Sequence, residues 1–357
     1  GTSRSIRTRV RSYFTASEQR RRMAEMVRIA DEVVPIVCAT TLEARVRELR
    51  LIAAEQPRYN QRSRRPDKQT WLKLTVEPAP RLAVVSTVAD DTAEGARYLG
   101  PFTSRAAASA AAEALLLVHP LRTCTPRLAR RPRTVTPGCA LAELGRCLAP
   151  CSADGDRAAY AALVEGARAA MSGDLRAVSA AVHERMRLLA HDERFEDAAL
   201  WRERLGHLVS ASVRTHRLTT VTTAAEVVAA CPTPDHGWDV HVIRHGRLAA
   251  AGHCPPGIDP RPLVDTLCLT AEQVAAAPAP APAGLTEETF EVLRWLDSPG
   301  VRLVRSDQSL SLPLHCGGDV EQRLGQVRSA RLPADRDDAG RPMGPVDARP
   351  VTRMLSA

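Results

Sequence analysis

The stretch CTPRLARRPRTVTPGCALAELGRCLAPC, residues 124–151, holds four cysteines within 28 residues. Cys124, Cys139, Cys147 and Cys151 are separated by fourteen, seven and three residues. Four thiolates at this spacing can converge on one tetrahedral centre, and both zinc and iron–sulfur clusters accept all-cysteine ligation. The spacing therefore predicts a metal or cluster site. The alternatives are buried free cysteines, which act as small hydrophobes, or disulfides, which need an oxidising compartment.

Length and composition bound the rest of the chain. A chain of 357 residues is long enough for two or three domains. Aromatic residues make up only 3% of it, so its cores must be built from Leu, Val and Ala. The opening GTSRSIRTRV lacks the apolar segment of a secretory signal, and no run approaches the roughly 18 apolar residues of a membrane span. We expect a cytoplasmic protein without a membrane partner.

Positive charge is concentrated at the N-terminal end. Residues 1–68 carry sixteen Lys and Arg against eight Asp and Glu, an excess equal to the net charge of +8 of the whole chain. Such a segment attracts phosphates, which favours DNA as the partner over a merely solvated basic face. The candidate DNA-binding residues are Arg4, Arg7 and Arg11, spaced to share one helix face, and the later cluster Arg62, Arg64 and Arg65.

Local patterns predict a chain of short elements. Helices are predicted at about 4–12, 17–30 and 41–56, the last capped by Thr41 or Thr40, with a strand at 33–39. Further along come a hairpin of strands 71–77 and 81–87, a turn at Gly100-Pro101, and a helix capped by Ser104 that ends near Val118. Apolar residues at helical spacing then predict an antiparallel helical hairpin at 174–211. This hairpin either packs on its own domain or binds a partner.

The order of these segments resembles UvrC, the nuclease subunit of bacterial nucleotide excision repair, and its short homologue Cho. The matching segments are GTSRSIRTRVRSYF (1–14), TLEARVRELRLIAAEQPRYN (41–60), YLGPFTS (98–104), PLRTC (120–124), LGRCLAPC (144–151) and VHERMRLLAHDERFEDAALWRERLGHL (182–208). The first is most similar to the UvrC-like module that actinobacteria fuse behind a DEDD-type 3′–5′ exonuclease. The resemblance covers roughly residues 1–250.

The resemblance implies a GIY-YIG nuclease site at the N-terminal end. Arg9 matches the family arginine that stabilises phosphate charge, Tyr13 a further aromatic, Glu48 the metal-binding glutamate, and Asn60 the asparagine after the metal helix. Glu48 is then expected to bind Mg²⁺ or Mn²⁺. Gly1 matches the glycine of YIG, so the hairpin with both family tyrosines is not part of this sequence, and we expect no incision by the chain as it stands.

The loss of that hairpin also has a folding consequence. The segment 33–38 would be the third strand of a sheet whose first two strands are missing, and an unpaired strand is unstable. We therefore expect residues 1–68 to be marginally stable.

The same resemblance assigns two further sites. UvrC proteins carry four similarly spaced cysteines, which favours a 4Fe–4S cluster over zinc at Cys124, Cys139, Cys147 and Cys151. Arg122 and its neighbouring arginines would offset the charge of the cluster or contact DNA. The turn HDERFEDAA, residues 191–199, resembles the UVR motif, so residues 174–211 are expected to bind a UvrB-like protein with Phe195 as the interface anchor.

The sequence thus predicts an α+β protein with an incomplete GIY-YIG domain, a cysteine-rich metal or cluster segment, a UVR helical hairpin and a small α/β C-terminal region. The expected divisions are 1–68, 69–173, 174–211, a UvrC-like region with strands at 212–276, a Pro/Ala linker at 277–284, a small α/β segment at 285–332 and a disordered tail at 333–357. The predicted function is DNA repair by a UvrC/Cho-like endonuclease. The alternatives are a non-catalytic adaptor that binds DNA and a UvrB-like protein, and a structural zinc module.

Overall fold

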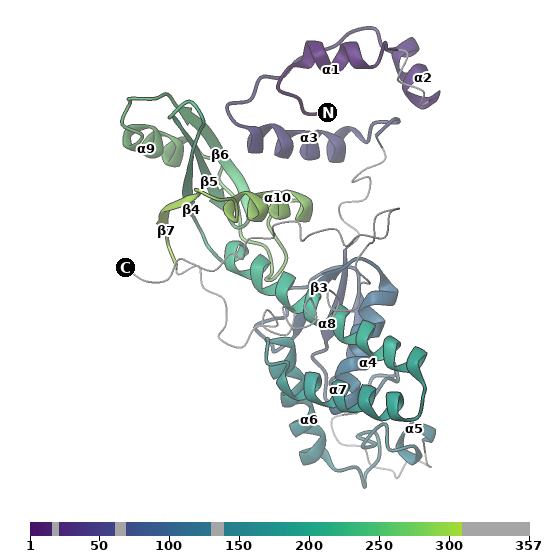
Figure 1. Ribbon diagram of the computed structural model, residues 1–357. Coiled ribbons are helices and arrows are strands. Elements are labelled where there is room, and N and C mark those ends of the chain that lie inside the picture. Colours follow the sequence, from purple (N-terminus) through teal and green to yellow (C-terminus); the bar gives the residue numbers. More distant parts are fainter. Residues whose placement is uncertain (16–20, 61–68, 130–138, 309–357) are drawn as a thin grey trace, which may run out of the picture.

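The computed structural model describes residues 1–15, 21–60, 69–129 and 139–308 (Figure 1). These residues form a mixed α/β structure with N-terminal helices, a middle region built on a three-stranded sheet, and a C-terminal region built on a four-stranded sheet. The expected α+β class is confirmed at the level of a mixed α/β structure. In the described part of the chain, no helix is both long and apolar enough to cross a bilayer.

The N-terminal region contains α1 (Ile6–Ser12), α2 (Arg21–Ile29) and α3 (Thr41–Glu55). The predicted cap of α3 is present, because the Glu43 N–H donates to Thr40 Oγ1 at 3.1 Å. The Glu43 carboxylate in turn accepts from the Ala39 N–H at 2.7 Å. Reciprocal bonds of this kind satisfy backbone N–H groups at the start of a helix, which explains why α3 begins here.

The predicted strand at 33–39 is wrong. These residues form no regular secondary structure, and Val33, Val34, Ile36 and Val37 expose between 46% and 91% of their surface. A strand is stabilised by backbone hydrogen bonds to a neighbour, and among the described residues no strand pairs with this segment. High β-propensity alone was therefore not enough to form a strand.

The middle region is built on an antiparallel sheet with the order β2-β1-β3. Its strands are β1 (Thr70–Leu74), β2 (Leu82–Val85) and β3 (Arg97–Phe102), and its helices are α4 (Arg105–Val118), α5 (Ala140–Glu143) and α6 (Arg157–Met171). The hairpin of β1 and β2 and the Ser104 cap of α4 are confirmed. The turn predicted at Gly100-Pro101 is wrong, because both residues lie within β3.

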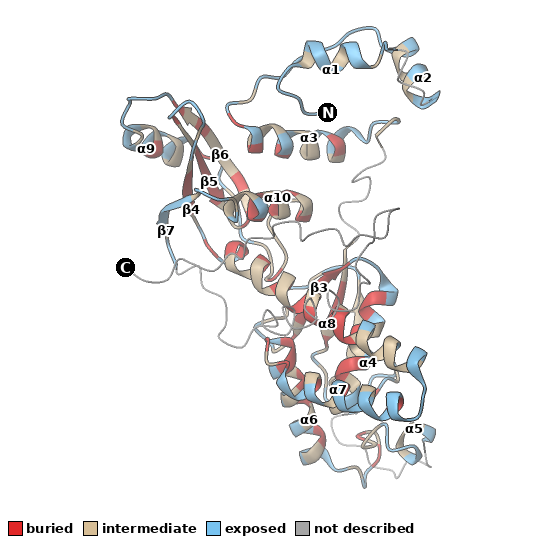
Figure 2. Cartoon of the chain, viewed as in Figure 1, coloured by how far each residue is buried: buried red, intermediate tan, exposed pale blue. Residues whose placement is uncertain are grey.

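The predicted helical hairpin is formed by α7 (Arg176–His191) and α8 (Phe195–Thr222). Leu205, Leu208 and Val209 on α8 are fully buried and join the apolar core with Val178 and Val182 on α7. The inner faces of α4, α7 and α8 are accordingly buried, while their outer faces are exposed (Figure 2). Helix α8 extends eleven residues past 211, the predicted end of the hairpin, and contacts both β3 and α10.

The C-terminal region is an antiparallel sheet with the order β6-β5-β4-β7. It consists of β4 (Val227–Pro232), β5 (Trp238–Arg244), β6 (Arg247–Cys254) and β7 (Arg302–Ser306), with α9 (Arg261–Thr270) and α10 (Thr286–Leu296). The segment 277–284 packs against this unit, since Pro280 is buried and the Ala283 N–H donates to the His245 carbonyl. Helix α10 and β7 therefore complete the unit that β4 to β6 begin. The expected tail lies outside the described residues.

Candidate functional site

The structure brings together two of the predicted nuclease residues. Glu48 lies on α3 with 29% of its side chain exposed, and its Oε1 is 3.6 Å from the Gly1 backbone nitrogen. A Cβ atom at Gly1 would lie 4.0 Å from Arg9 Nη2 and 4.0 Å from Glu48 Oε1. The guanidinium and the carboxylate therefore approach the same point. A carboxylate that is partly exposed can hold a hydrated divalent cation, and an arginine fork suits a phosphoryl group.

The other two predicted residues of this set lie at element ends. Tyr13 caps the C-terminus of α1, and the Arg9 guanidinium carbon lies 5.6 Å from the centre of its ring. Tyr13 thus joins Arg9 at the candidate site by a cation–π contact. Asn60 lies in the turn that follows α3, where its N–H donates to the Pro57 carbonyl at 3.2 Å.

Glu48 faces a cavity of about 750 Å³ that sequence reasoning missed. One wall comes from α3, and the others come from α8 and α10, which lie more than 150 residues away in the sequence. The wall carries both signs of charge, from the arginines Arg45, Arg214, Arg217 and Arg294 and the acids Glu48, Glu287, Glu291 and Asp297. Only the tertiary fold places these residues together, so no local motif could have identified them.

The predicted DNA-binding arginines of the N-terminal region are exposed where the structure describes them. Arg7 and Arg11 lie on α1, and Arg4 precedes the helix, which begins at Ile6 rather than at residue 4. Arg62, Arg64 and Arg65 lie outside the described residues. The exposed Arg4, Arg7 and Arg11 are available to a phosphate backbone, which arginine binds through charge-assisted hydrogen bonds.

The four cysteines of residues 124–151 lie in one region of the middle domain. Cys124, Cys147 and Cys151 are partly buried and Cys139 is exposed. Burial raises the pKa of the Cys147 thiol, and the nearby Cys124, Cys151 and Cys139 raise it further, so all four thiols lie within electrostatic reach. Within the described ranges, however, no three Cys, His, Asp or Glu side chains are arranged to hold a metal ion. The donor set suits a four-sulfur site, while the described side chains are not arranged as one.

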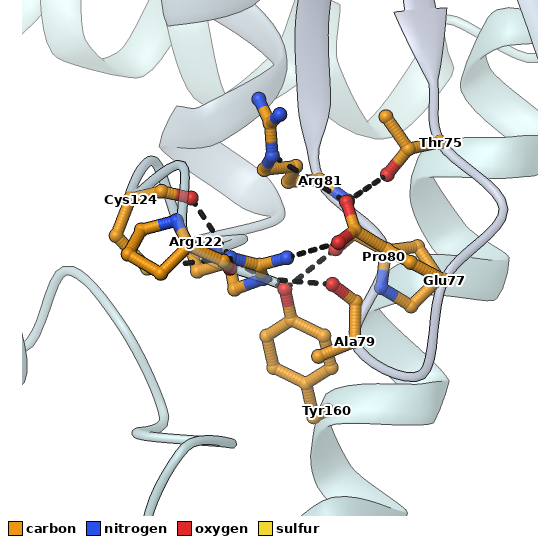
Figure 3. Close-up of polar contacts among 9 residues, drawn as sticks. Thr75, Glu77, Ala79, Pro80, Arg81, Arg122, Cys124 and Tyr160 are labelled. Carbon is orange, nitrogen blue, oxygen red and sulfur yellow. Dashed lines mark hydrogen bonds and ion pairs between the residues drawn. The ribbon is translucent and has the colours of Figure 1, made fainter. Parts of the chain in front are cut away.

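Buried Arg122 connects this cysteine segment to the β1–β2 loop (Figure 3). Only 1% of Arg122 is exposed. Its Nε donates to the Ala79 carbonyl at 2.8 Å, its Nη1 to the Cys124 carbonyl at 2.8 Å and the Pro126 carbonyl at 2.9 Å, and its Nη2 to Glu77 Oε2 at 2.5 Å. Nη1 also lies 3.4 Å from Cys124 Sγ. Of the two roles expected for Arg122, contact with DNA is wrong, because the side chain is buried and its donors are used inside the protein.

Tyr160 on α6 completes this network. Its hydroxyl donates to the Pro80 carbonyl at 2.6 Å and accepts from the Arg122 backbone N–H at 3.2 Å. Burial raises the pKa of Tyr160 to about 12, so the hydroxyl stays protonated and able to donate. Glu77 also accepts from the Thr75 hydroxyl at 2.6 Å. The β1–β2 loop and α6 thus hold the start of the cysteine segment in place.

We expect Arg122→Met to lower the free energy of unfolding by about 3 kcal/mol, because it leaves the Glu77 carboxylate and three backbone carbonyls without their buried donor. Urea unfolding followed by circular dichroism measures this change. The matched control is Arg127→Met, at an exposed arginine five residues further on, which should change stability by no more than about 0.5 kcal/mol. Equal stabilities of the two variants would contradict the role given to Arg122.

The helical hairpin presents large apolar side chains to solvent. Phe195, the first residue of α8, is 63% exposed, and Leu188 and Leu200 are 44% and 49% exposed. Trp201 is partly buried beneath the guanidinium of Arg204, whose central carbon lies 4.5 Å from the ring centre. Exposed apolar groups of this size on a folded hairpin are typical of a protein-binding surface.

Comparison with known proteins separates the N-terminal region from the middle region, as the fold does. Residues 1–61 match the UvrC-like GIY-YIG domain, and residues 69–170 match the middle domain of the UvrC/Cho excinucleases. A protein of Mycobacterium tuberculosis named as a bifunctional exonuclease/endonuclease is 37% identical over 345 residues, which are 95% of this chain and 52% of the relative. No solved structure matches the chain.

Two relatives named UvrABC system protein C are similar over shorter ranges. The protein of Geobacter metallireducens is 36% identical over 237 residues, 64% of this chain and 36% of the relative. That of Symbiobacterium thermophilum is 33% identical over 252 residues, 70% of this chain and 39% of the relative. The chain thus spans about half or less of the length of these curated relatives.

The fold and the comparisons together define a mixed α/β protein with a UvrC-like GIY-YIG domain followed by a UvrC-type middle domain. The chain belongs to the UvrC/Cho excinuclease family.

Proposed function

We propose that this chain acts in nucleotide excision repair in the cytoplasm, as the part of a UvrC/Cho-type endonuclease that binds DNA and carries half of its N-terminal nuclease site. The observation that carries the proposal is the approach of Arg9 and Glu48 to one point beside Gly1. A general basic surface would not require a carboxylate next to its arginine.

The chemistry of the proposed site is phosphodiester hydrolysis. Glu48 would hold Mg²⁺ or Mn²⁺, which supplies a Lewis acid for the scissile phosphate. Arg9 would donate to the phosphoryl oxygens, where negative charge develops in the transition state, and Tyr13 would orient Arg9 through its ring. The exposed Arg4, Arg7 and Arg11 would bind the flanking backbone phosphates.

The proposal is tested with a lesion-containing DNA duplex, a UvrB-like protein and Mg²⁺ or Mn²⁺. In the family, two tyrosine-bearing strands precede the position of Gly1, so the assay compares the chain alone with the chain joined to those strands from a UvrC relative. We expect metal-dependent nicks only from the joined protein. DNA binding without nicks from either protein would instead support the adaptor function.

A second proposal rests on a separate observation, the exposed Phe195 at the start of α8. We propose that the hairpin α7–α8 is a UVR-type motif that binds a UvrB-like protein through Phe195, and this contact serves either function. Phe195→Ala is expected to weaken that complex about 30-fold, which corresponds to about 2 kcal/mol, because buried aromatic anchors dominate such interfaces.

Isothermal titration calorimetry with the UvrB-like protein measures the effect of Phe195→Ala. The control is Phe14→Ala, which removes an equally large side chain that is 70% exposed in the N-terminal region. The two variants should differ in affinity. An unchanged affinity for Phe195→Ala would remove Phe195 from the interface.

We also propose that Cys124, Cys139, Cys147 and Cys151 hold a 4Fe–4S cluster, with zinc as the alternative. The proposal is supported by the donor set and by the electrostatic effect of the other three thiols on Cys147. Arg122 would position Cys124 through its bond to the Cys124 carbonyl. Iron, sulfide and zinc determination after anaerobic purification separates the two metals.

A further inference from the structure

Helix α3 packs on a part of the chain that follows it by almost 200 residues. Although the next element in sequence is β1 of the middle region, helix α3 lies beside α10 and β6 (Figure 1). Leu42 and Val46 are 4% and 2% exposed. They share a core cluster with Val227, Ile243, Leu248 and Val292. This burial removes the main apolar residues of α3 from water, which stabilises the contact.

An ion pair between partly exposed Arg50 and buried Glu288 holds α3 on the same surface. Arg50 Nη2 and Nε lie 2.6 and 3.0 Å from the two carboxylate oxygens of Glu288, which is fully buried on α10. Nη2 also donates to the Leu248 carbonyl at 2.8 Å, and the Leu248 N–H donates back to Glu288 at 2.9 Å. Desolvation is the largest single effect and lowers the pKa of Arg50, but the hydrogen bond to Glu288 together with the charges of Glu288 and Glu272 holds the pKa above its ordinary value.

A second polar contact fixes the start of α3. The cap residue Thr40 lies with its hydroxyl 2.8 Å from His241 Nε2 on β5, and both residues are buried. The His241 ring meets Trp295 of α10 edge-on, with ring centres 4.2 Å apart. Burial lowers the pKa of His241 to about 3, so the imidazole is neutral at physiological pH. Two directional contacts along one helix determine both its position and its rotation.

We propose that residues 224–306, named here the platform, dock helix α3 and thereby fix the position of Glu48. The matches to the GIY-YIG domain and to the middle domain end at residue 170, so the platform lies outside both domains. Glu48 shares a helix with the docked residues, and α10 of the platform also forms a wall of the cavity that Glu48 faces. The platform is thus a support for the candidate nuclease site. This inference concerns position and goes beyond the proposed incision chemistry.

Hydrogen exchange of the full chain, followed by mass spectrometry of peptides, tests this proposal. Arg50→Met removes the ion pair from the α3 side and leaves the platform sequence intact. We expect the amides of residues 42–55 to exchange at least about 10-fold faster than in the unsubstituted chain. The amides of β5 should keep their exchange rates within about twofold, because that strand is held by β4 and β6.

The matched control is Arg47→Met on the same helix, where Arg47 is half exposed and pairs only weakly with Glu43 at 3.8 Å. Loss of Arg50 also leaves the buried Glu288 carboxylate with only the Leu248 N–H as a donor among the described residues, which could disturb the platform itself. Val46→Ala is therefore a second variant, because it weakens only the apolar contact between α3 and the platform. Faster exchange of α3 in Arg50→Met and Val46→Ala supports docking. Exchange of α3 in both variants equal to that in Arg47→Met overturns it. Neither result depends on incision activity.

Discussion

Replacing Glu48 with glutamine is expected to lower metal-dependent incision at least about 100-fold, in the chain joined to the tyrosine strands of a UvrC relative. Glutamine keeps the size of the side chain but removes the charge that attracts a divalent cation. A metal ion that stabilises transition-state charge contributes several kcal/mol, and a loss of about 2.7 kcal/mol corresponds to a factor of 100. Initial rates of nicking at several Mg²⁺ concentrations measure the effect.

Two comparisons separate this effect from loss of binding or folding. Glu55→Gln changes an exposed carboxylate at the end of the same helix and should leave the rate of nicking unchanged. Fluorescence anisotropy should give the same DNA affinity for Glu48→Gln as for the unsubstituted protein, because phosphate binding depends on the arginines. Incision by Glu48→Gln at the full rate would exclude Glu48 as the metal ligand.

Replacing Cys147 with serine is expected to remove essentially all iron that copurifies with the chain. Burial raises the pKa of the Cys147 thiol, and the other three cysteines of the set raise it further, which places Cys147 within electrostatic reach of each of them. A serine hydroxyl is far less acidic than a thiol and a poorer ligand for iron. Iron content and visible absorbance after anaerobic purification report the loss, from about four irons per chain in the parent protein.

The control for this experiment is Cys231→Ser, at a partly buried cysteine on β4 outside the set. It should retain the full iron content. If Cys147→Ser and Cys231→Ser bind equal amounts of iron, the metal does not reside at the four cysteines. Stoichiometric zinc in place of iron, lost in the Cys147 variant, would keep the site and change its chemistry.

Features that depend on neighbouring residues could be predicted from the sequence. The hydroxyl groups of Thr40 and Ser104 cap their helices by accepting from the backbone N–H three residues further on. Short hydroxyl side chains before a helical pattern predict such caps. The hairpins β1–β2 and α7–α8 follow likewise from the period of their apolar residues. The proposed nuclease residues Arg9 and Glu48 were found through family resemblance, since an exposed arginine or a helical glutamate is unremarkable by itself.

Features that depend on distant partners could not be predicted. Arg122 stands in a run of arginines that all look exposed in sequence, and only the position of Glu77 and the carbonyls around it explains its burial. The docking of α3 depends on Glu288 and His241, far along the chain. The strand predicted at 33–39 failed because a distant partner is missing rather than present. The segment has high β-propensity, but no strand lies beside it within the described structure.

Helix α8 is long enough to reach from the tip of the helical hairpin to the cavity beside Glu48. At 1.5 Å per residue, its 28 residues form a rod of about 42 Å. Phe195 stands at one end, and the other end passes beside α10. One continuous helix thus connects Phe195 to the wall of the cavity beside Glu48, to which α8 contributes Arg214 and Arg217.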